Sequence, residues 1–244
     1  MEYNIYVVGI GPGGIDGMTY GAVKAIEECD LVVGYKVYVE LVKEIFPKKE
    51  YFSSAMKQEK DRVQYAIDAA LEGKKVAVIS SGDSGVYGMA GLVHEMAEKT
   101  PQLSIRVIAG VTAATSGAAL LGAPLIHDFA VISLSDLLTP WEDIEKRLEL
   151  AAKGDFCICI YNPSSKKRAD YLQKACDILL QWQKEDLVCG IVRNVGRAGE
   201  EYRIVTLKEL RNEAVDMFST IFIGNSNTKV MHGKMVTPRG YKYV

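Results

Sequence analysis

The stretch NIYVVGIGPGG (residues 4–14) decides the fold class of this 244-residue chain. Residues 4–9 form a short β-branched and aromatic run that ends in glycine, which is typical of a buried parallel strand. A glycine-rich turn follows, and residues 19–29 have the pattern of a helix. A strand, a glycine turn and a helix in this order favour an α/β fold.

The same alternation continues through the rest of the chain. We expect strands at 31–34, 75–80, 104–108, 130–134, 156–161, 187–192, 201–205 and 219–224, and helices at 61–72, 87–99, 166–182 and 206–213. Between residues 121 and 129, glycine, proline and lone polar residues interrupt this order. We therefore predict two α/β domains, residues 1–122 and 123–244, with mainly parallel sheets.

Two further helix starts are marked by a threonine with a glutamate three positions later. Thr139 is followed by Pro140 and Glu142, which places a hydroxyl at the N-cap and proline at the first helical position. Thr206 and Glu209 repeat the spacing of a capping box. Both threonines are predicted to cap a helix of the second domain.

The composition narrows the function classes. Apolar residues make up 48% and charged residues 25% of the chain, which is the profile of a folded globular protein. The formal net charge of -2 provides no basic field for nucleic acid or anionic membranes. No apolar run approaches the ~20 residues of a membrane helix. We therefore expect neither nucleic acid nor a membrane as partner.

The five cysteines contain no CxxC pair and follow no secretion signal, which suits a reducing cytoplasm. Cys157 and Cys159 lie two apart in a strand-like run, so both should point to one face and pack in the core. No metal site of the protein's own is expected.

Glycine-rich turns follow most of the predicted strands, at the carboxyl ends where open α/β sheets bind ligands. Gly9, Gly11 and Gly14 satisfy the G-x-G-x-x-G pattern of dinucleotide-binding folds. Pro12 opposes that interpretation because it removes a backbone N–H that a pyrophosphate would need. The second strand also lacks the acidic residue that would bind a ribose hydroxyl.

Six motifs, in order and spacing, resemble those of the tetrapyrrole (class III) methyltransferases. GIGPGG (9–14), GDSGVYGMAG (82–91) and AGVTAATSGAALLGAPL (109–125) are similar to the superfamily as a whole. GYKVYVELV (34–42), VISLSDLLTPW (131–141) and YNPSSKKR (161–168) more closely resemble its precorrin-3B and cobalt-precorrin-3 C-17 branch. One departure is GDSG, where much of the superfamily has GDP.

The resemblance implies a homodimer with S-adenosylmethionine bound in a cleft between two α/β domains of each chain. The enzyme would methylate C-17 of a corrin precursor in cobalamin synthesis, contract the ring and release S-adenosylhomocysteine. The substrate is metal-free or carries cobalt; the sequence leaves this open. A tetrapyrrole methylase that acts at another ring carbon, and a non-catalytic tetrapyrrole-binding protein, are the alternatives.

The resemblance also assigns site residues. Those implied at the cofactor are Gly82, Asp83, Val86, Thr112, Ala113, Asn162, Asn194 and Thr220. Those predicted at the substrate are Gly11, Pro12, Gly13, Lys36, Ser135, Lys166 and Arg168. Asp83 has an alternative as the cap of the helix near Tyr87, and Lys166 and Arg168 have one as part of a solvated helix face. No general base is assigned.

Overall fold

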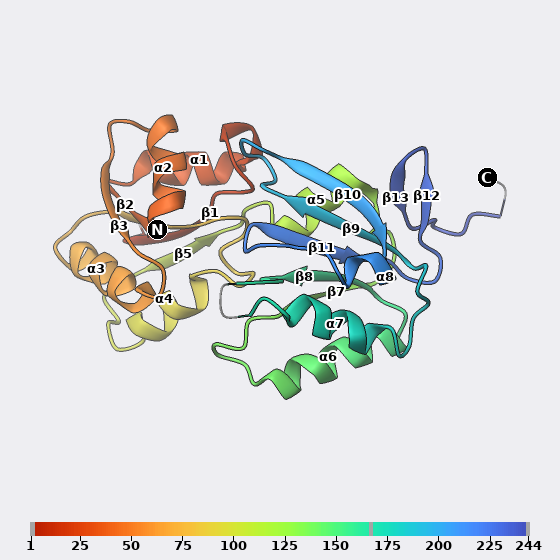
Figure 1. Ribbon diagram of the computed structural model, residues 1–244. Coiled ribbons are helices and arrows are strands. Elements are labelled where there is room, and N and C mark those ends of the chain that lie inside the picture. Colours follow the sequence, from red (N-terminus) through yellow and green to blue (C-terminus); the bar gives the residue numbers. More distant parts are fainter. Residues whose placement is uncertain (1–2, 166–167, 243–244) are drawn as a thin grey trace. The chain divides into compact units, whose positions relative to one another are not determined.

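The apolar run at the start of the chain forms strand β1 (Ile5–Gly9), which is an inner strand of a five-stranded sheet (Figure 1). The structure is a computed structural model, and it describes residues 3–165 and 168–242. The order of this sheet is β3-β2-β4-β1-β5, and all its pairings are parallel. Its other strands are β2 (Leu31–Tyr35), β3 (Glu50–Ser54), β4 (Val76–Ser80) and β5 (Ile105–Ile108).

Helices cover both faces of the first sheet. They are α1 (Tyr20–Glu28), α2 (Lys36–Ile45), α3 (Glu59–Leu71) and α4 (Ala90–Ala97). Ile5 and Val7 of β1 pack with residues of α3 and α4, whereas Tyr6 and Val8 pack with α1 and α2. Each fully buried valine or isoleucine contributes roughly 1.5–3 kcal/mol to folding. Because both faces are buried, β1 is a continuous apolar run.

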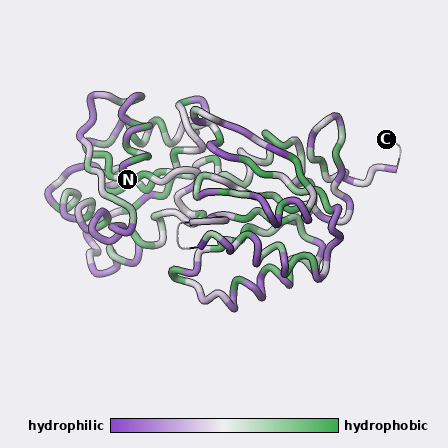
Figure 2. The backbone as a smooth tube through the Cα atoms, viewed as in Figure 1, coloured by the Kyte–Doolittle hydropathy of each residue, from purple (hydrophilic) through white to green (hydrophobic). Residues whose placement is uncertain are grey.

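The second sheet has the order β10-β9-β11-β8-β7. Its strands are β7 (Phe129–Ser133), β8 (Cys157–Tyr161), β9 (Val188–Arg193), β10 (Glu201–Thr206) and β11 (Ser219–Ile223). Helices α6 (Trp141–Lys153), α7 (Tyr171–Leu179) and α8 (Leu207–Leu210) pack on one face, and α5 (Ala113–Leu121) packs on the other. Along α6 and α7 hydrophobic and hydrophilic residues alternate, as expected for helices with one buried side (Figure 2).

The α/β class and the parallel first sheet are confirmed, whereas the expectation of a mainly parallel second sheet is corrected. Only β7 and β8 pair in parallel; β11 is antiparallel to both β8 and β9, and β10 is antiparallel to β9. One reversal explains this arrangement. The turn at residues 194–200 sends β10 back along β9, and β11 then runs in the direction of β10 and inserts between β8 and β9.

A third, small sheet completes the second half of the chain. It joins β6 (Gly122–Ala123), β13 (Lys234–Val236) and β12 (Lys229–Met231). Among the described residues, no helix combines the length and the apolar character needed to cross a membrane.

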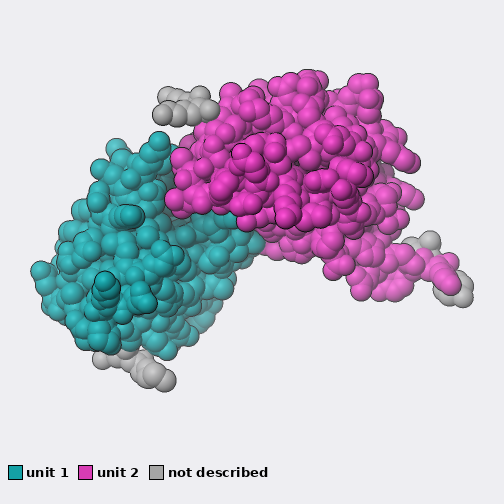
Figure 3. All heavy atoms as spheres, turned by 90° about the horizontal axis from the view of Figure 1, so that it is seen from below, with its two compact units in different colours: residues 1–113 teal, residues 114–244 magenta. Residues whose placement is uncertain are grey.

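The chain divides into two units, residues 1–113 and 114–244 (Figure 3). The expected boundary lay further along, between residues 122 and 123. The earlier division follows from the packing of α5, because Ala114, Ala118 and Leu121 lie in a core cluster with Val192 and Phe222 of the second sheet. Gly117 makes this packing close: a Cβ added there would lie 2.8 Å from Val192 Cγ2.

Candidate active site

The loops that follow three strands of the first sheet meet at one edge. β4, β1 and β5 are neighbours and run in parallel, so their last residues, Ser80, Gly9 and Ile108, lie at the same end of the sheet. Ligands of open α/β sheets bind beyond this end. The three glycine-rich turns of the first unit are therefore brought together, as the strand-and-turn pattern predicted.

Glycines let these loops approach each other at backbone distance. A Cβ on Gly110 would lie 2.1 Å from the carbonyl oxygen of Gly82 and 2.5 Å from that of Gly9, too close for any side chain. Gly11 and Gly82 exchange backbone hydrogen bonds of 3.0 and 2.8 Å. Thus Gly11, predicted at the substrate, lies directly beside Gly82, predicted at the cofactor.

The turn after β5 packs on the same glycine. A Cβ added to Gly82 would lie 3.6 Å from Ala113 N and 3.6 Å from Thr112 Cα, which is ordinary contact distance. Val86 N donates a 3.3 Å hydrogen bond to Asp83 O within the loop after β4. The five cofactor residues predicted in the first unit therefore belong to two adjoining loops.

Asp83 connects these two loops through its carboxylate. Oδ1 accepts from Gly85 N at 2.7 Å, and Oδ2 accepts from Gly110 N at 2.8 Å. The carboxylate does not cap α4, which begins at Ala90 with Met89 as its N-cap. Among the described residues, no lysine or arginine forms an ion pair with Asp83. This half-buried negative charge without a cation of its own can bind a cationic group of a ligand.

Two contacts of this site were not predicted. Gly110 was left out of the candidate residues, although its place two residues after a predicted strand, in the AGVT run, could have indicated it. Ser84 is fully buried, and its Oγ donates to Val7 O at 3.1 Å. This bond fixes the loop after β4 to the middle of β1, and no local sequence signal indicates it.

The turn after β1 does not have the geometry of a dinucleotide-binding loop. The N–H of Gly11 is used by Gly82, and Pro12 has none. A short 3-10 helix (Ile15–Gly17) intervenes before α1, whose N-cap Thr19 accepts from Ala22 N at 3.1 Å. Gly13 is buried within this turn. The N-terminus of α1 is therefore separated from the glycines by the 3-10 helix.

Lys36 lies at the same edge as these loops. It is the exposed first residue of α2 and directly follows β2, which pairs with β4. Its position suits the predicted contact with an anionic substrate, since an exposed ammonium there can bind a carboxylate.

In the second unit, the predicted cofactor residues lie at one edge of the second sheet: Asn162 and Asn194 follow strand ends, and Thr220 is near the start of β11. Asn162 and Asn194 directly follow β8 and β9, and both have a φ of 52°. This left-handed conformation is one that asparagine tolerates better than most residues. Asn194 N donates to Phe218 O at 3.2 Å, and Thr220 pairs with Val192 across β11 and β9.

Two predicted substrate residues of the second unit touch each other. Arg168 Nη1 donates to Ser135 Oγ at 2.7 Å and to Asp136 Oδ1 at 3.1 Å. Arg168 precedes α7 and its side chain is only 17% exposed, so it is not part of a solvated helix face. Tyr171 Oη donates to Asp136 Oδ2 at 2.7 Å, and this hydrogen bond lowers the pKa of Asp136. Lys166 lies outside the described residues.

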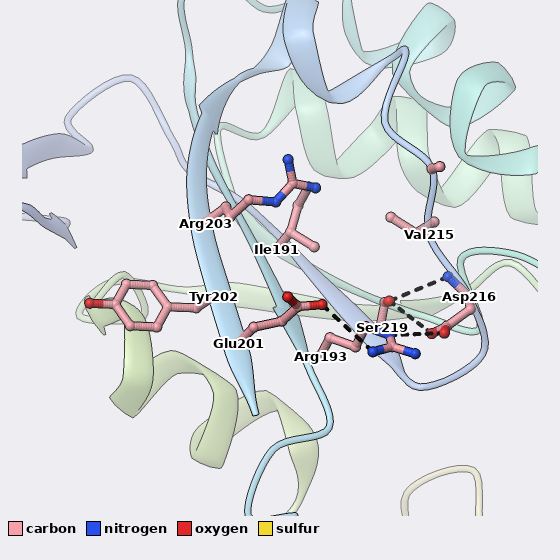
Figure 4. Close-up of a pocket in the computed structure, with 9 residues that line it drawn as sticks. Ile191, Arg193, Glu201, Tyr202, Arg203, Val215, Asp216 and Ser219 are labelled. Carbon is pink, nitrogen blue, oxygen red and sulfur yellow. Dashed lines mark hydrogen bonds and ion pairs between the residues drawn. The ribbon is translucent and has the colours of Figure 1, made fainter. Parts of the chain in front are cut away.

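A cavity of about 300 Å³ lies beside the ends of β9 and β11 (Figure 4). Arg193 Nε is 2.9 Å from Asp216 Oδ2, and its Nη1 is 3.6 Å from Glu201 Oε1. Burial alone would raise the pKa of Asp216, but hydrogen bonds from Arg193, Phe218 and Ser219 outweigh it and the pKa is lowered. Arg203, which also lines the cavity, pairs with Glu213. The charged side chains that line this cavity thus have ion-pair partners, in contrast to Asp83.

The chain matches a family model over residues 4–211, that of the Tetrapyrrole (Corrin/Porphyrin) Methylases. The chain belongs to this family. The predicted tetrapyrrole methylase family, its α/β fold and its methyltransferase activity are therefore confirmed.

Relatives of this methylase are named as methyltransferases of cobalt-factor III, several of them as C(17)-methyltransferases. A probable cobalt-factor III C(17)-methyltransferase of Salmonella typhimurium is 48% identical over 236 residues, which are 96% of this chain and 98% of that protein. A cobalt-factor III methyltransferase of Priestia megaterium is 44% identical over 99% of this chain but 46% of its own length. The chain thus spans nearly all of some relatives and about half of others. The likeness to the C-17 branch is confirmed.

The solved structure of the methyltransferase CobJ has a TM-score of 0.89 and 35% identity to this methylase, over 97% of this chain and 100% of that one. A Thermus thermophilus uroporphyrin-III C-methyl transferase complexed with S-adenyl homocysteine has a TM-score of 0.73 at 19% identity, over 90% of this chain and 96% of that one, and shares the fold.

Proposed function

We propose that this methylase transfers the methyl group of S-adenosylmethionine to C-17 of a corrin precursor, cobalt-factor III or precorrin-3B, with ring contraction, in cobalamin biosynthesis. The observation that carries the proposal is the Asp83 carboxylate, which is held between two glycine loops by Gly85 and Gly110 and forms no ion pair with any lysine or arginine of residues 3–165 and 168–242. The 48% identity to a C-17 methyltransferase over nearly its full length supports the substrate class.

The residues at the first edge suit the cofactor's chemistry. S-adenosylmethionine, when bound, supplies a methyl group already activated by its sulfonium, together with an ammonium and a carboxylate. Asp83 would bind the ammonium. Backbone groups of Gly82, Val86, Thr112 and Ala113 would hold the rest, because small residues and exposed peptide groups fit a compact polar ligand.

The second unit would contribute Asn162, Asn194 and Thr220 to the same cofactor. Both asparagines lie in a left-handed turn at a strand end, which leaves side-chain and backbone groups at the edge. Asn162 Nδ2 donates to Ser133 Oγ at 2.9 Å, so its amide oxygen remains an acceptor for a ligand hydroxyl or amine.

The protein's own contribution to rate would be alignment. Transfer to an electron-rich carbon needs no protein nucleophile, and fixing two reactants in line can supply about 7–11 kcal/mol in the best intramolecular models. Gly11, Pro12 and Gly13 would let the backbone approach the flat macrocycle. Lys36 would bind a peripheral carboxylate, and Ser135 with Arg168 would contact the substrate from the second unit.

We further propose a cytoplasmic homodimer. All five cysteines are free and buried, which suits a reducing compartment. Light scattering coupled to size exclusion tests the dimer: a mass of one chain would contradict it.

Titration calorimetry of the purified protein with S-adenosylhomocysteine tests whether the protein binds the proposed cofactor, and a titration with NADH is run in parallel as a control. We expect micromolar binding of the first compound alone. Incubation with S-adenosylmethionine and either cobalt-factor III or precorrin-3B then tests the substrate, with the methylated carbon located by NMR. A methyl group at another ring carbon would favour the alternative methylase, and binding without turnover of either substrate would favour a non-catalytic binding protein.

A further inference from the structure

Arg62 of α3 is a buried cation whose hydrogen bonds all reach neutral groups. The residue as a whole is only 3% exposed. Nε donates to Ser54 Oγ at 3.0 Å, and Nη2 donates to Ala55 O at 3.1 Å. Nη1 contacts Met89 Sδ at 3.8 Å. No carboxylate of residues 3–165 or 168–242 forms an ion pair with it.

Such a charge is costly for folding. Desolvation lowers the pKa of Arg62, an effect opposed by Glu59, Tyr38 and Tyr35, yet arginine stays charged in proteins. An apolar side chain of similar length would fill the same space without desolvating a charge. The segments that the guanidinium joins by its hydrogen bonds offer a reason for its presence.

The hydrogen bonds of the guanidinium connect the end of strand β3 to the start of helix α4, which follows strand β4. Ser54 is the last residue of β3, and Met89 is the N-cap of α4, at the far end of the loop after β4. β2 lies between β3 and β4 in the sheet. Met89 N also donates to Ser80 Oγ at 3.2 Å, which ties the far end of the loop back to its origin.

Residues 81–88, hereafter the cofactor loop, lie between those two anchors. The near part of this loop is fixed by Gly82 and Asp83, as described above. Tyr87, close to the far end, has a φ of 52°, a conformation that costs free energy unless its surroundings hold it. An anchor at Met89 supplies such a constraint.

We propose that Arg62 is a positioning residue for methyl transfer, which fixes Met89 and thereby the conformation of the cofactor loop. The inference rests on the proposed function, because that function gives the loop its ligand. Arg62 is too buried to touch the ligand itself, so its effect must pass through Met89 and the residues 54–55.

Three variants separate positioning from general stability. Arg62→Met removes the fork and keeps most of the length; Arg62→Lys keeps a donor; Lys60→Met, at an exposed position on the same helix, is the matched control. Hydrogen exchange of the ligand-free variants is followed for the cofactor loop and Met89, and separately for β1 and β4. S-adenosylhomocysteine affinity is measured by calorimetry.

For Arg62→Met we expect at least tenfold faster exchange confined to the cofactor loop and Met89, and at least tenfold weaker S-adenosylhomocysteine binding. Arg62→Lys should recover part of both, and Lys60→Met should match the wild type. Uniformly faster exchange in β1, β4 and the loop would overturn the inference, since it would show loss of global stability alone. Unchanged loop exchange would overturn it too. Failure of the wild type to bind S-adenosylhomocysteine refutes the proposed function separately, because the exchange measurement needs no ligand.

Discussion

Asp83 shows how one side chain serves both the fold and the site. Its two oxygens accept from Gly85 N and Gly110 N, which join the loops after β4 and β5. The motif indicated an aspartate at the cofactor but left helix capping open. The structure removes the capping alternative, because α4 starts beyond its reach with Met89 as N-cap.

Asp83→Asn tests the charge with little change of shape. We expect S-adenosylhomocysteine binding to weaken roughly 10- to 100-fold, because a charged hydrogen bond contributes about 1.5–3 kcal/mol. Calorimetric titration measures this, and thermal unfolding checks that the variant is folded. Asp16→Asn, at an exposed position in the same unit, is the control. Equal affinity of the folded Asp83 variant and the wild type would mean that the carboxylate serves the loops only.

Gly110→Ala tests the close approach of the loops. The new Cβ would meet two backbone carbonyl oxygens, at Gly82 and Gly9, that cannot move without shifting the loops. Overpacking of this kind costs about 1–3 kcal/mol, so we expect a lower urea midpoint together with weaker S-adenosylhomocysteine binding. Gly91→Ala is the matched control, for which a change of stability in the opposite direction is expected. Its Cβ meets nothing within 4 Å in α4, so a gain of up to ~1 kcal/mol is expected. Equal effects of the two substitutions would contradict this explanation.

At the scale of elements, only one of the two threonines that were predicted to cap a helix does so. Thr206 caps α8: its Oγ1 accepts from Glu209 N at 3.2 Å, and Glu209 Oε2 accepts from Thr206 N at 2.8 Å. Thr139 does not cap α6, whose N-cap is Pro140 with no side-chain hydrogen bond. The same local spacing thus gives a capping box in one place and none in the other, because the backbone before α6 enters the helix one residue later than expected.

Thr206→Ala and Thr139→Ala therefore form a matched pair. We expect the first to lower the free energy of unfolding by about 0.5–2 kcal/mol, because a backbone donor of α8 loses its acceptor. The second should change it by less than ~0.5 kcal/mol, as most surface substitutions do. Urea unfolding at pH 7 measures both. A larger loss in Thr139→Ala than in Thr206→Ala would show that the assigned caps are wrong.

At the scale of the whole molecule, several carboxylates favour the folded state at neutral pH. Hydrogen bonds from Tyr171, from Lys174 and from Thr206 lower the pKa values of Asp136, Asp170 and Glu209 respectively. A carboxyl group with a lowered folded pKa stabilises the fold above its unfolded pKa, and this contribution is lost as the pH falls through the folded value. Their ordinary values of 3.8 and 4.5 set the upper limit of that window.

We therefore expect these groups to leave the urea midpoint constant between pH 7 and pH 5 and to lower it progressively below about pH 4.5. Unfolding curves by circular dichroism at pH 7, 5, 4 and 3 measure the effect. In Asp136→Asn the acid-induced decrease should be smaller than in the wild type, because one of the titrating groups is gone. A midpoint that rises on acidification would contradict the sign of these pKa changes.

The sequence by itself determined four of the five strands of the first sheet, all but β3 (Glu50–Ser54), together with the positions of the glycine turns and the family. These features depend on neighbours along the chain: an apolar run that ends in glycine marks a strand and the turn after it wherever it packs. The direction of β10 and β11, the Asp83 contact with Gly110 and the Arg62 contact with Met89 were decided by tertiary structure alone. Each joins segments that are distant in sequence, and no local pattern states which distant backbone group will stand at hydrogen-bonding distance once the sheets have packed.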